Sequence, residues 1–375
     1  MAQLMKILNA ISWIENITNS IEHMLTPMNS STLAMTYFNL SKITKEESYR
    51  QKGLELIQRL LKKQNDDGSW NEIYPNINAK STLATAYVGL MLAKIGIYNN
   101  SLLENMDYCL IKATEYVVNN EKKPGYFLKS EINDKDTVNV NLICALFLLY
   151  MYKHFQRDDL LKISMRTVKR VMKAQLESGA FPYYHDEKRY LTPLHYHAYI
   201  TRLLVDYFLL LPDDELYSSL KKAISWLSNK LETDGRINWH GDVGVWVYRN
   251  FSTYGNALYT LIFASALIDN SLKRLIQPVR DYIFSRQLQD GSFPESDSNF
   301  TIHNISTDIK NIFKLISYQE FFSALSLIRG MINQKYLNNL FNKVAANIQL
   351  MEAFTSSIIL DFSLRRECWN MSKKV

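Results

Sequence analysis

The chain of 375 residues alternates between two kinds of helical pattern. The first has apolar residues three and four positions apart, as at Leu54, Ile57 and Leu60 in residues 49–63, and indicates a helix with one buried face. The second is apolar nearly all round and indicates a helix buried on all sides. The half-buried pattern recurs in residues 158–175, 213–231 and 271–288, and the fully apolar pattern in 83–95, 138–152, 199–211 and 257–268.

A glycine turn separates each half-buried segment from the apolar segment that follows. An aromatic residue follows each glycine within four positions, and a lysine or arginine precedes it within six. A cation in the last turn of a helix is favoured by the helix dipole, and a following glycine suits a left-handed cap. We therefore expect each glycine to end a helix, and all of them to lie at one end of the molecule. The glycines are Gly68, Gly125, Gly179, Gly235 and Gly291, with gaps of 57, 54, 56 and 56 residues.

This repeat of about 56 residues predicts an all-α fold. One unit holds an outer helix, a turn, a loop and an inner helix, because a mean helix takes only about 11–12 residues. Residues 2–24 and 31–42 hold one more pair of helices, and residues 319–365 another. Six or seven pairs are enough to close a ring. We predict a single domain, residues 1–375, built as an α/α toroid of about six helix hairpins.

Known repeat proteins share the turn motif. The segment Gln64-Asn-Asp-Asp-Gly-Ser-Trp70, with its copies at 175–181 and 287–293, resembles the repeats of the terpenoid cyclase and protein prenyltransferase superfamily. It also resembles the turns of six-hairpin, glycosidase-like toroids. The resemblance covers about residues 45–300 and implies the architecture rather than one chemistry. Residues 136–204 are similar, more narrowly, to toroid proteins associated with bacterial polysaccharide biosynthesis.

The chain departs from the terpenoid side of this resemblance. It has no Asp-x-Asp-Asp acid motif of class II cyclases and no Asp-rich motif for magnesium diphosphate. No cysteine stands near a histidine in a loop after a turn, as the zinc site of a prenyltransferase requires. We therefore expect no metal or other cofactor. For a metal held by His195 or His197, the plausible further ligands are His240, Asp242 and His303.

The charge, the cysteines and the hydropathy indicate the cellular compartment of the protein and its classes of partner. The net charge of +6 is spread along the chain, which argues against a nucleic-acid partner. The three cysteines show no paired spacing, as in a reducing compartment. The first residues lack the features of a signal peptide, and no run of 18 apolar residues indicates a membrane span. We expect a cytoplasmic protein.

Polar residues gather where the inner helices are expected to begin, and ring closure would bring them together. His195 is the candidate general base, because an unperturbed imidazole titrates near pH 6.5. Asp242 or Asp308 would be the acid or the orienting carboxylate, with Asp136 beside them. Helix capping is the simpler explanation for Thr82 and Thr307, and solvated loop charge for any single acid, whereas Asn141 fits capping and ligand binding equally well. The candidate substrate-binding residues are Asn141, His197, Tyr254, Trp246, Trp239 and Tyr184.

Three functions fit this pattern. A carbohydrate-active enzyme of hydrolase, lyase or epimerase type accounts for polar, aromatic loops with histidines and carboxylates, and would act on a saccharide or another small molecule. A terpenoid cyclase-like or prenyl-binding protein would instead need an aromatic pocket without a polar floor. A non-catalytic toroid that binds a glycan or a protein would lack paired carboxylates across the cavity. The first of these is our prediction.

Overall fold

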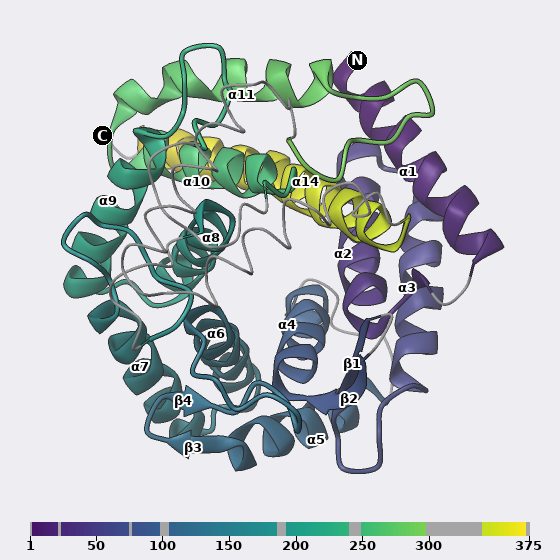
Figure 1. Ribbon diagram of the computed structural model, residues 1–375, viewed down its shortest axis with the longest axis vertical. Helices are drawn as coiled ribbons and strands as arrows, with labels where there is room; N and C mark the ends of the chain where they lie inside the picture. Colours follow the sequence, from purple (N-terminus) through teal and green to yellow (C-terminus); the bar gives the residue numbers. More distant parts are fainter. Residues whose placement is uncertain are drawn as a thin grey trace, which may run out of the picture.

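The computed structural model describes residues 2–21, 24–74, 77–97, 105–185, 193–239, 249–297 and 340–372. Within these ranges, six outer helices surround six inner helices (Figure 1). The outer helices are α1 (Ala2–Ser20), α3 (Glu47–Leu61), α5 (Met106–Asn119), α7 (Asp158–Lys173), α9 (Asp214–Ser228) and α11 (Lys273–Ser285). The inner helices are α2 (Pro27–Thr44), α4 (Thr82–Ile97), α6 (Val138–Phe155), α8 (Leu194–Leu210), α10 (Thr253–Leu267) and α14 (Leu340–Ser372).

Both rings close on themselves. Each inner helix packs against the next one in chain order, and α14 packs against α2. The outer ring closes where Lys6 Nζ of α1 donates a hydrogen bond to the carbonyl oxygen of Phe284 in α11, at 2.8 Å. This architecture confirms the predicted all-α toroid of six hairpins.

The two hydropathy patterns separate the two rings. In α7 the buried residues include Leu160, Ile163 and Val171, which share one face of the helix, and the opposite face is solvated. In α6 every residue of Val138–Met151 is buried. By length and apolar composition, α6 is the one described helix that fits a membrane span, but most of it is buried inside the ring. Its apolar character thus follows from its place in the core.

All five repeat glycines have positive φ, as a left-handed turn requires. They do not cap the outer helices as predicted, because each lies six or seven residues after its helix ends, in the turn that follows. Gly179, with φ +92°, shows why glycine is needed: an added Cβ would lie 2.5 Å from the carbonyl oxygen of Lys222 in α9. Gln175 Nε2 donates to the carbonyl oxygens of Gly179 and Ser219, both at 2.9 Å. Each turn is therefore fastened to the next outer helix, and the repeated relation sets the five turns on the same face of the ring.

The fifth repeat turn contacts the first outer helix, α1, and this contact closes the outer ring. Gln287 Nε2 donates to the carbonyl oxygens of Gly291 and of Lys6 in α1, both at 2.7 Å. An added Cβ on Gly291 would lie 2.9 Å from the carbonyl oxygen of Asn9. The contact that links successive repeats thus also joins the fifth turn to the first helix.

Some boundaries differ from the prediction. Helix α8 begins at Leu194, with Pro193 as the residue before it, rather than near residue 199, so His195 and His197 lie on the helix itself. Two short antiparallel hairpins were not predicted. β1 (Trp70–Tyr74) and β2 (Ile77–Ser81) form one after the Gly68 turn, and β3 (Glu121–Lys123) and β4 (Tyr126–Phe127) form one whose turn contains Gly125. Of the predicted tail pair, the described part is the single helix α14.

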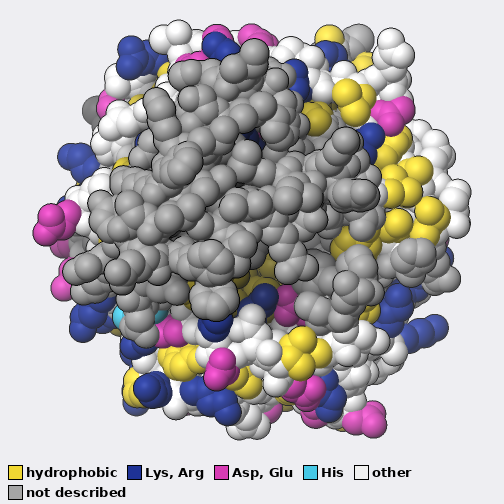
Figure 2. All heavy atoms as spheres, in the orientation of Figure 1, with side chains coloured by type: hydrophobic (Ala, Val, Ile, Leu, Met, Phe, Trp, Pro, Cys, Tyr) yellow, Lys and Arg dark blue, Asp and Glu magenta, His cyan; other side chains and the backbone are white. Residues whose placement is uncertain are grey.

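Among the described residues at the rim of the face in Figure 2, no strong single-sign patch is visible. Lysine and arginine side chains alternate with aspartate and glutamate around the visible rim. This distribution agrees with a positive charge that is spread along the sequence.

Candidate functional site

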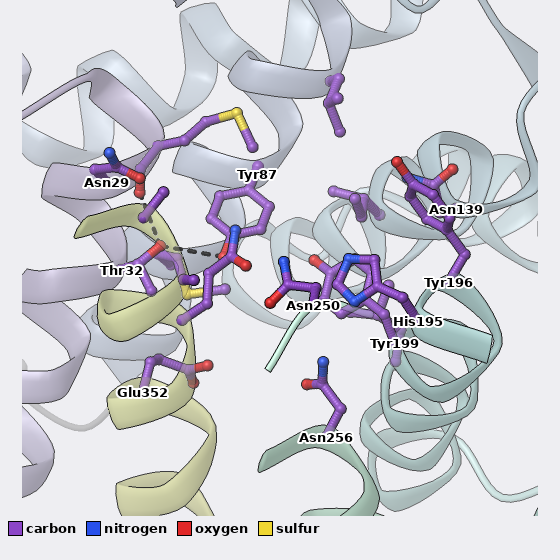
Figure 3. Close-up of a pocket in the computed structure, with 18 of the residues that line it drawn as sticks. Asn29, Thr32, Tyr87, Asn139, His195, Tyr196, Tyr199, Asn250, Asn256 and Glu352 are labelled. Carbon is purple, nitrogen blue, oxygen red and sulfur yellow. Dashed lines mark hydrogen bonds between the residues drawn. The ribbon is translucent and has the colours of Figure 1, made fainter. Parts of the chain in front are cut away.

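A cavity of about 340 Å³ lies at the centre of the inner ring (Figure 3). All six inner helices contribute to its wall, and the β1 hairpin adds Asn71 and Ile73. Its volume lies at the lower end of the range for small-molecule sites, roughly 300–1,000 Å³. The predicted cavity of the toroid is therefore present, and it suits a small ligand.

Three alternate inner helices, α4, α8 and α14, each line the cavity with a row of four side chains on one helix face. We call each row a stripe. On α8 the stripe runs from His195 through Tyr199 and Arg202 to Asp206. Residues spaced by three and four positions share one helix face, and eleven residues span about 16 Å. The corresponding stripes are Leu83, Tyr87, Met91 and Lys94 on α4, and Phe341, Ala345, Gln349 and Glu352 on α14. Each stripe ends in a charged residue at a similar depth.

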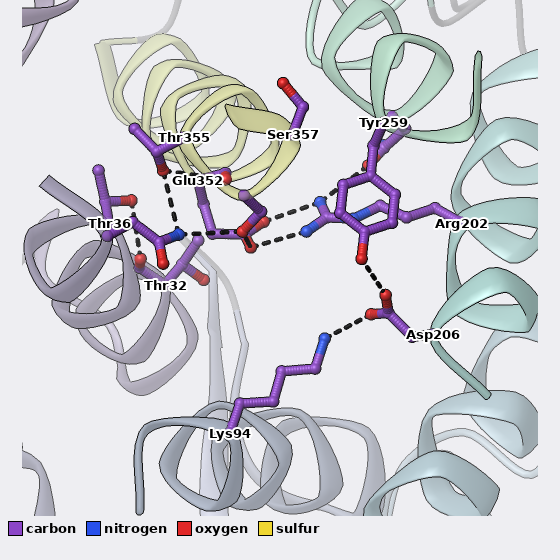
Figure 4. A network of polar contacts seen from close by, with 12 residues as sticks. Thr32, Thr36, Lys94, Arg202, Asp206, Tyr259, Glu352, Thr355 and Ser357 are labelled. Atoms are coloured by element: carbon purple, nitrogen blue, oxygen red, sulfur yellow. Dashed lines mark hydrogen bonds and ion pairs between the residues drawn. The ribbon is translucent and has the colours of Figure 1, made fainter. Parts of the chain in front are cut away.

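The charged ends meet in a network that we call the floor of the cavity, formed by Lys94, Arg202, Asp206 and Glu352 (Figure 4). Lys94 Nζ lies 2.5 Å from Asp206 Oδ2. Arg202 donates to both oxygens of Glu352, at 2.8 and 2.7 Å. Tyr259 of α10 donates to Asp206 Oδ1 at 2.6 Å. All four floor side chains are nearly buried, at 5–9% exposure.

The floor carboxylates are held ionised. Burial opposes ionisation, but the neighbouring Lys94 and Arg202 cations outweigh it and lower the pKa of Asp206. In the same way, Arg202 outweighs burial and lowers the pKa of Glu352. Since both carboxylates stay charged and paired, neither is suited to exchange protons near neutral pH.

His195 lies at the opposite end of the α8 stripe. Its Nδ1 atom lies 3.1 Å from Thr253 Oγ1, and its ring packs edge to face on Tyr196. Burial lowers the pKa of His195 to about 4, because a charged imidazole would lose its hydration. At neutral pH the imidazole is therefore uncharged.

Uncharged polar groups cover much of the remaining wall. The carboxamides that line it are Asn29, Asn71, Asn139, Asn250, Asn256, Asn342 and Gln349. Asn139 is 6% exposed, and its Oδ1 atom has no hydrogen-bond partner among the described residues. The Tyr199 hydroxyl likewise has none. Buried polar atoms are nearly always paired, so these two atoms indicate where a polar ligand would bind.

The structure gives three predicted substrate-binding residues another role. Asn141, His197 and Tyr254 have an exposed fraction of 0% and do not line the cavity. Each accepts a hydrogen bond from the backbone N–H of the residue two positions after a repeat glycine, as do Thr85 and Asn347. The five donors are Trp70, Phe127, Phe181, Ile237 and Phe293, at 2.7–3.1 Å from Thr85, Asn141, His197, Tyr254 and Asn347, respectively.

These five acceptors pin each repeat turn to its inner helix. The prediction that Asn141, His197 and Tyr254 border the cavity is therefore wrong, since all three are buried behind its wall. The physical reason is that the N–H group of a buried turn must be paired, and the first turns of the inner helix supply the acceptor. The polar residues at the inner-helix starts were recognised correctly, but most of them stabilise the turn.

The other described candidates also lie outside the cavity lining. Asp136 is held by Arg170 at 2.5 Å and by Asn141 at 2.6 Å. Trp239 Nε1 donates to Asp297 Oδ2 at 2.9 Å, and Tyr184 packs against Tyr183. His195 is thus the one described member of the predicted site that lines the cavity. Asp242, Trp246 and Asp308, with His240 and His303, lie outside the described residues.

The sequence did contain a signal for the floor. Lys94, Arg202 and Asp206 each interrupt a helix that is otherwise apolar nearly all round, and charged residues are almost never buried unless they are paired. Their partners could not be identified, because the ion pairs join residues that are 112 and 150 positions apart. In the described ranges no three histidine, cysteine or acidic side chains form a potential metal site, and the expectation of no metal stays a prediction.

No protein-family model and no curated protein sequence matches the chain. Solved structures match its fold. The GH76A α-1,6-mannanase of Salegentibacter matches with a TM-score of 0.63 and 11% identity, over 94% of this chain and 98% of that one. The cellobiose 2-epimerase of Bacillus thermoamylovorans matches with a TM-score of 0.61 and 11% identity, over 72% and 82%.

A type II terpene cyclase from Scytonema has a TM-score of 0.60 at 11% identity, over 96% of this chain and 97% of that one. Glycosidase-like toroids and a terpene cyclase thus appear together, as the turn motif implied. The chain therefore has an α/α-toroid fold. At such low identity the likeness shows the fold alone.

Proposed function

We propose that the protein is a carbohydrate-active enzyme of the isomerase or epimerase type, with His195 as its general base. Such an enzyme removes a proton from the carbon beside the carbonyl group of an open-chain sugar and returns it to a neighbouring position or to the other face. The observation that carries the proposal is a neutral imidazole on the wall of a small, amide-lined cavity. The epimerase with the same fold acts, by its name, on cellobiose.

The lining of the cavity supports a sugar as substrate. Carboxamide side chains both donate and accept hydrogen bonds, as sugar hydroxyls do. Tyr87, Tyr183 and Tyr196 add aromatic surface to the same wall. The polar, charged floor argues against a terpenoid, because an apolar chain would leave these groups desolvated without new partners.

The carboxylates argue against a hydrolase in the described part of the site. Glycoside hydrolysis uses two carboxyl groups, one of which is protonated to serve as the acid. Asp206 and Glu352, the described acidic residues of the lining, are both ionised and engaged in ion pairs. A histidine that removes the proton beside the carbonyl group and returns it to the neighbouring carbon on the same face, as in an isomerase, requires neither carboxylate to change its state; an epimerase would need a second acid on the other face.

Solvent isotope exchange tests the proposal. The purified protein is incubated in D₂O with a panel of free hexoses and reducing disaccharides, and proton NMR follows deuterium uptake beside the carbonyl carbon and the appearance of the isomer. We expect exchange with at least one sugar. His195→Ala should reduce its rate by roughly 10²- to 10⁴-fold, the usual contribution of a general base.

His154→Ala is the matched control. His154 is exposed at the end of α6, where it contacts Asp107 far from the cavity lining. This variant should retain the full exchange rate. Sugar binding without any exchange in the wild-type protein would make it a binding protein, and release of a new reducing end would make it a hydrolase; either result would overturn the proposal.

A further inference from the structure

The floor of the cavity uses charges where apolar packing would be sufficient. The pair Lys94–Asp206 joins α4 to α8 past α6, and the pair Arg202–Glu352 joins α8 to α14 past α10. Apolar residues of similar volume often replace a buried ion pair with no loss of stability. The integrity of the ring therefore gives no sufficient reason for four charges at the end of a cavity.

Two groups at the floor retain hydrogen-bonding capacity. Lys94 Nζ makes one hydrogen bond with the described residues, to Asp206, although an ammonium group has three donors. The hydroxyl of Tyr199, about one helical turn before Arg202 on the same stripe, has no partner among the described residues. These groups leave donors and an acceptor available to a ligand that reaches the floor.

Each charged residue of the described lining has a partner of opposite sign, although Glu72, the partner of Lys129, is not itself part of the lining. Lys94 and Arg202 are paired with Asp206 and Glu352, and Lys129 lies 3.3 Å from the buried Glu72. A ligand that carried its own charge would lose hydration without gaining an uncompensated partner. An uncharged ligand with several hydroxyls has no such cost.

From these observations we infer that the floor is a subsite for the hydroxyl groups of a neutral sugar, held by Lys94, Asp206 and Tyr199. The Arg202–Glu352 pair fixes the position of the stripe that presents Tyr199 and Asp206. The inference rests on the proposed function and adds the substrate class. The ligand is a neutral sugar or the neutral end unit of a short saccharide, rather than a uronate or a sugar phosphate.

Calorimetric titration of the full-length protein tests the substrate class. The neutral probes are D-glucose, D-mannose, cellobiose and mannobiose, and the charged probes are D-glucuronate, D-mannuronate and glucose 6-phosphate. We expect at least one neutral probe to bind, and each charged probe to bind at least tenfold more weakly. Equal or tighter binding of a charged probe would overturn the inference while the proposed function survives.

Two variants test the residues. In the double variant Lys94→Met with Asp206→Leu, the volume is kept and the hydrogen-bonding groups are lost, so the neutral sugar should bind about 10- to 100-fold more weakly. Tyr199→Phe removes a hydroxyl that has no described protein partner, so the melting temperature should be unchanged or higher while affinity falls roughly 3- to 10-fold.

The matched control is Arg50→Met with Glu47→Leu, which removes an ion pair on the surface of α3. It should leave affinity unchanged. If the folded floor variants and Tyr199→Phe bind the neutral sugar as tightly as the wild type, the floor is merely structural and the inference fails. If the wild-type protein binds no probe at all, the proposed function fails as well.

Discussion

The Nδ1 atom of His197 accepts a hydrogen bond from the backbone N–H of Phe181, at 3.1 Å. Its Nε2 atom lies 3.0 Å from the carbonyl oxygen of Ala223, and the whole side chain is buried beside Trp226. His195, two residues earlier, lines the cavity. His197 therefore holds the repeat turn, whereas His195 faces the cavity. One variant of each residue distinguishes the structural role from the proposed catalytic role.

His197→Leu should lower the free energy of unfolding by about 1–3 kcal/mol, because it leaves a buried N–H group without an acceptor. Enzymatic turnover at a temperature where the variant is folded should be unchanged. His195→Ala should show the opposite result, with nearly normal stability and little turnover. Chemical denaturation and the exchange assay measure both effects. Loss of turnover in fully folded His197→Leu would return His197 to the mechanism.

Stability should fall as the pH decreases from about 6.5. Burial lowers the pKa of His195 to about 4 and that of His197 to about 3, whereas both titrate near 6.5 in the unfolded chain. In this window the unfolded state binds more protons than the native state. Each histidine therefore removes up to about 1.4 kcal/mol of stability for each pH unit of acidification.

Thermal unfolding at pH 7.5, 6.5, 5.5 and 4.5 would show this loss. The contribution of these two histidines to the free energy of unfolding should be nearly constant above pH 6.5 and should decline below it. His197→Leu should flatten the decline, because one of the two titrating groups is gone. An equally steep decline in that variant would mean that His197 is already accessible to protons in the native protein.

The repeat turns should differ in their tolerance of a side chain. An added Cβ at Gly179 would lie 2.5 Å from a backbone carbonyl oxygen, whereas at Gly125 the nearest atom is 3.1 Å away. Both positions have positive φ, which costs an L-residue roughly 1–2 kcal/mol. Gly179→Ala should therefore destabilise the protein more than Gly125→Ala. Urea denaturation of the two variants measures the difference, and the reverse order would contradict the proposed packing of the turns.

The Arg202–Glu352 pair should show strong coupling. Arg202→Met leaves the buried Glu352 carboxylate without its cation, which should cost about 3–5 kcal/mol. The double variant Arg202→Met with Glu352→Leu should recover most of this loss, since no charge remains unpaired. A double-mutant cycle by urea denaturation tests the prediction. Additive losses in the double variant would show that the two residues do not stabilise each other in the folded protein.

The candidate site was predicted from sequence only in part. His195 was recognised from its residue type and its place near the start of an inner helix, and the structure puts it on the cavity wall. Asn141, His197 and Tyr254 carry the same signal, because a turn that needs a buried acceptor also selects polar residues at these positions. Sequence position alone does not show whether such a side chain faces a ligand or a backbone N–H.

The sequence by itself determined the architecture. Five glycines at regular intervals, each after a half-buried helix and before an apolar one, predict stacked helix pairs, and six or seven such pairs with the resemblance of the turn motif predict their closure into a ring. The floor of the cavity was decided only by the tertiary structure. Lys94 finds Asp206 across 112 residues, and Arg202 finds Glu352 across 150, because ring closure sets their helices at one depth around one axis. Helical periodicity is a local property, whereas the pairing of these charges depends on contacts between helices far apart in the chain.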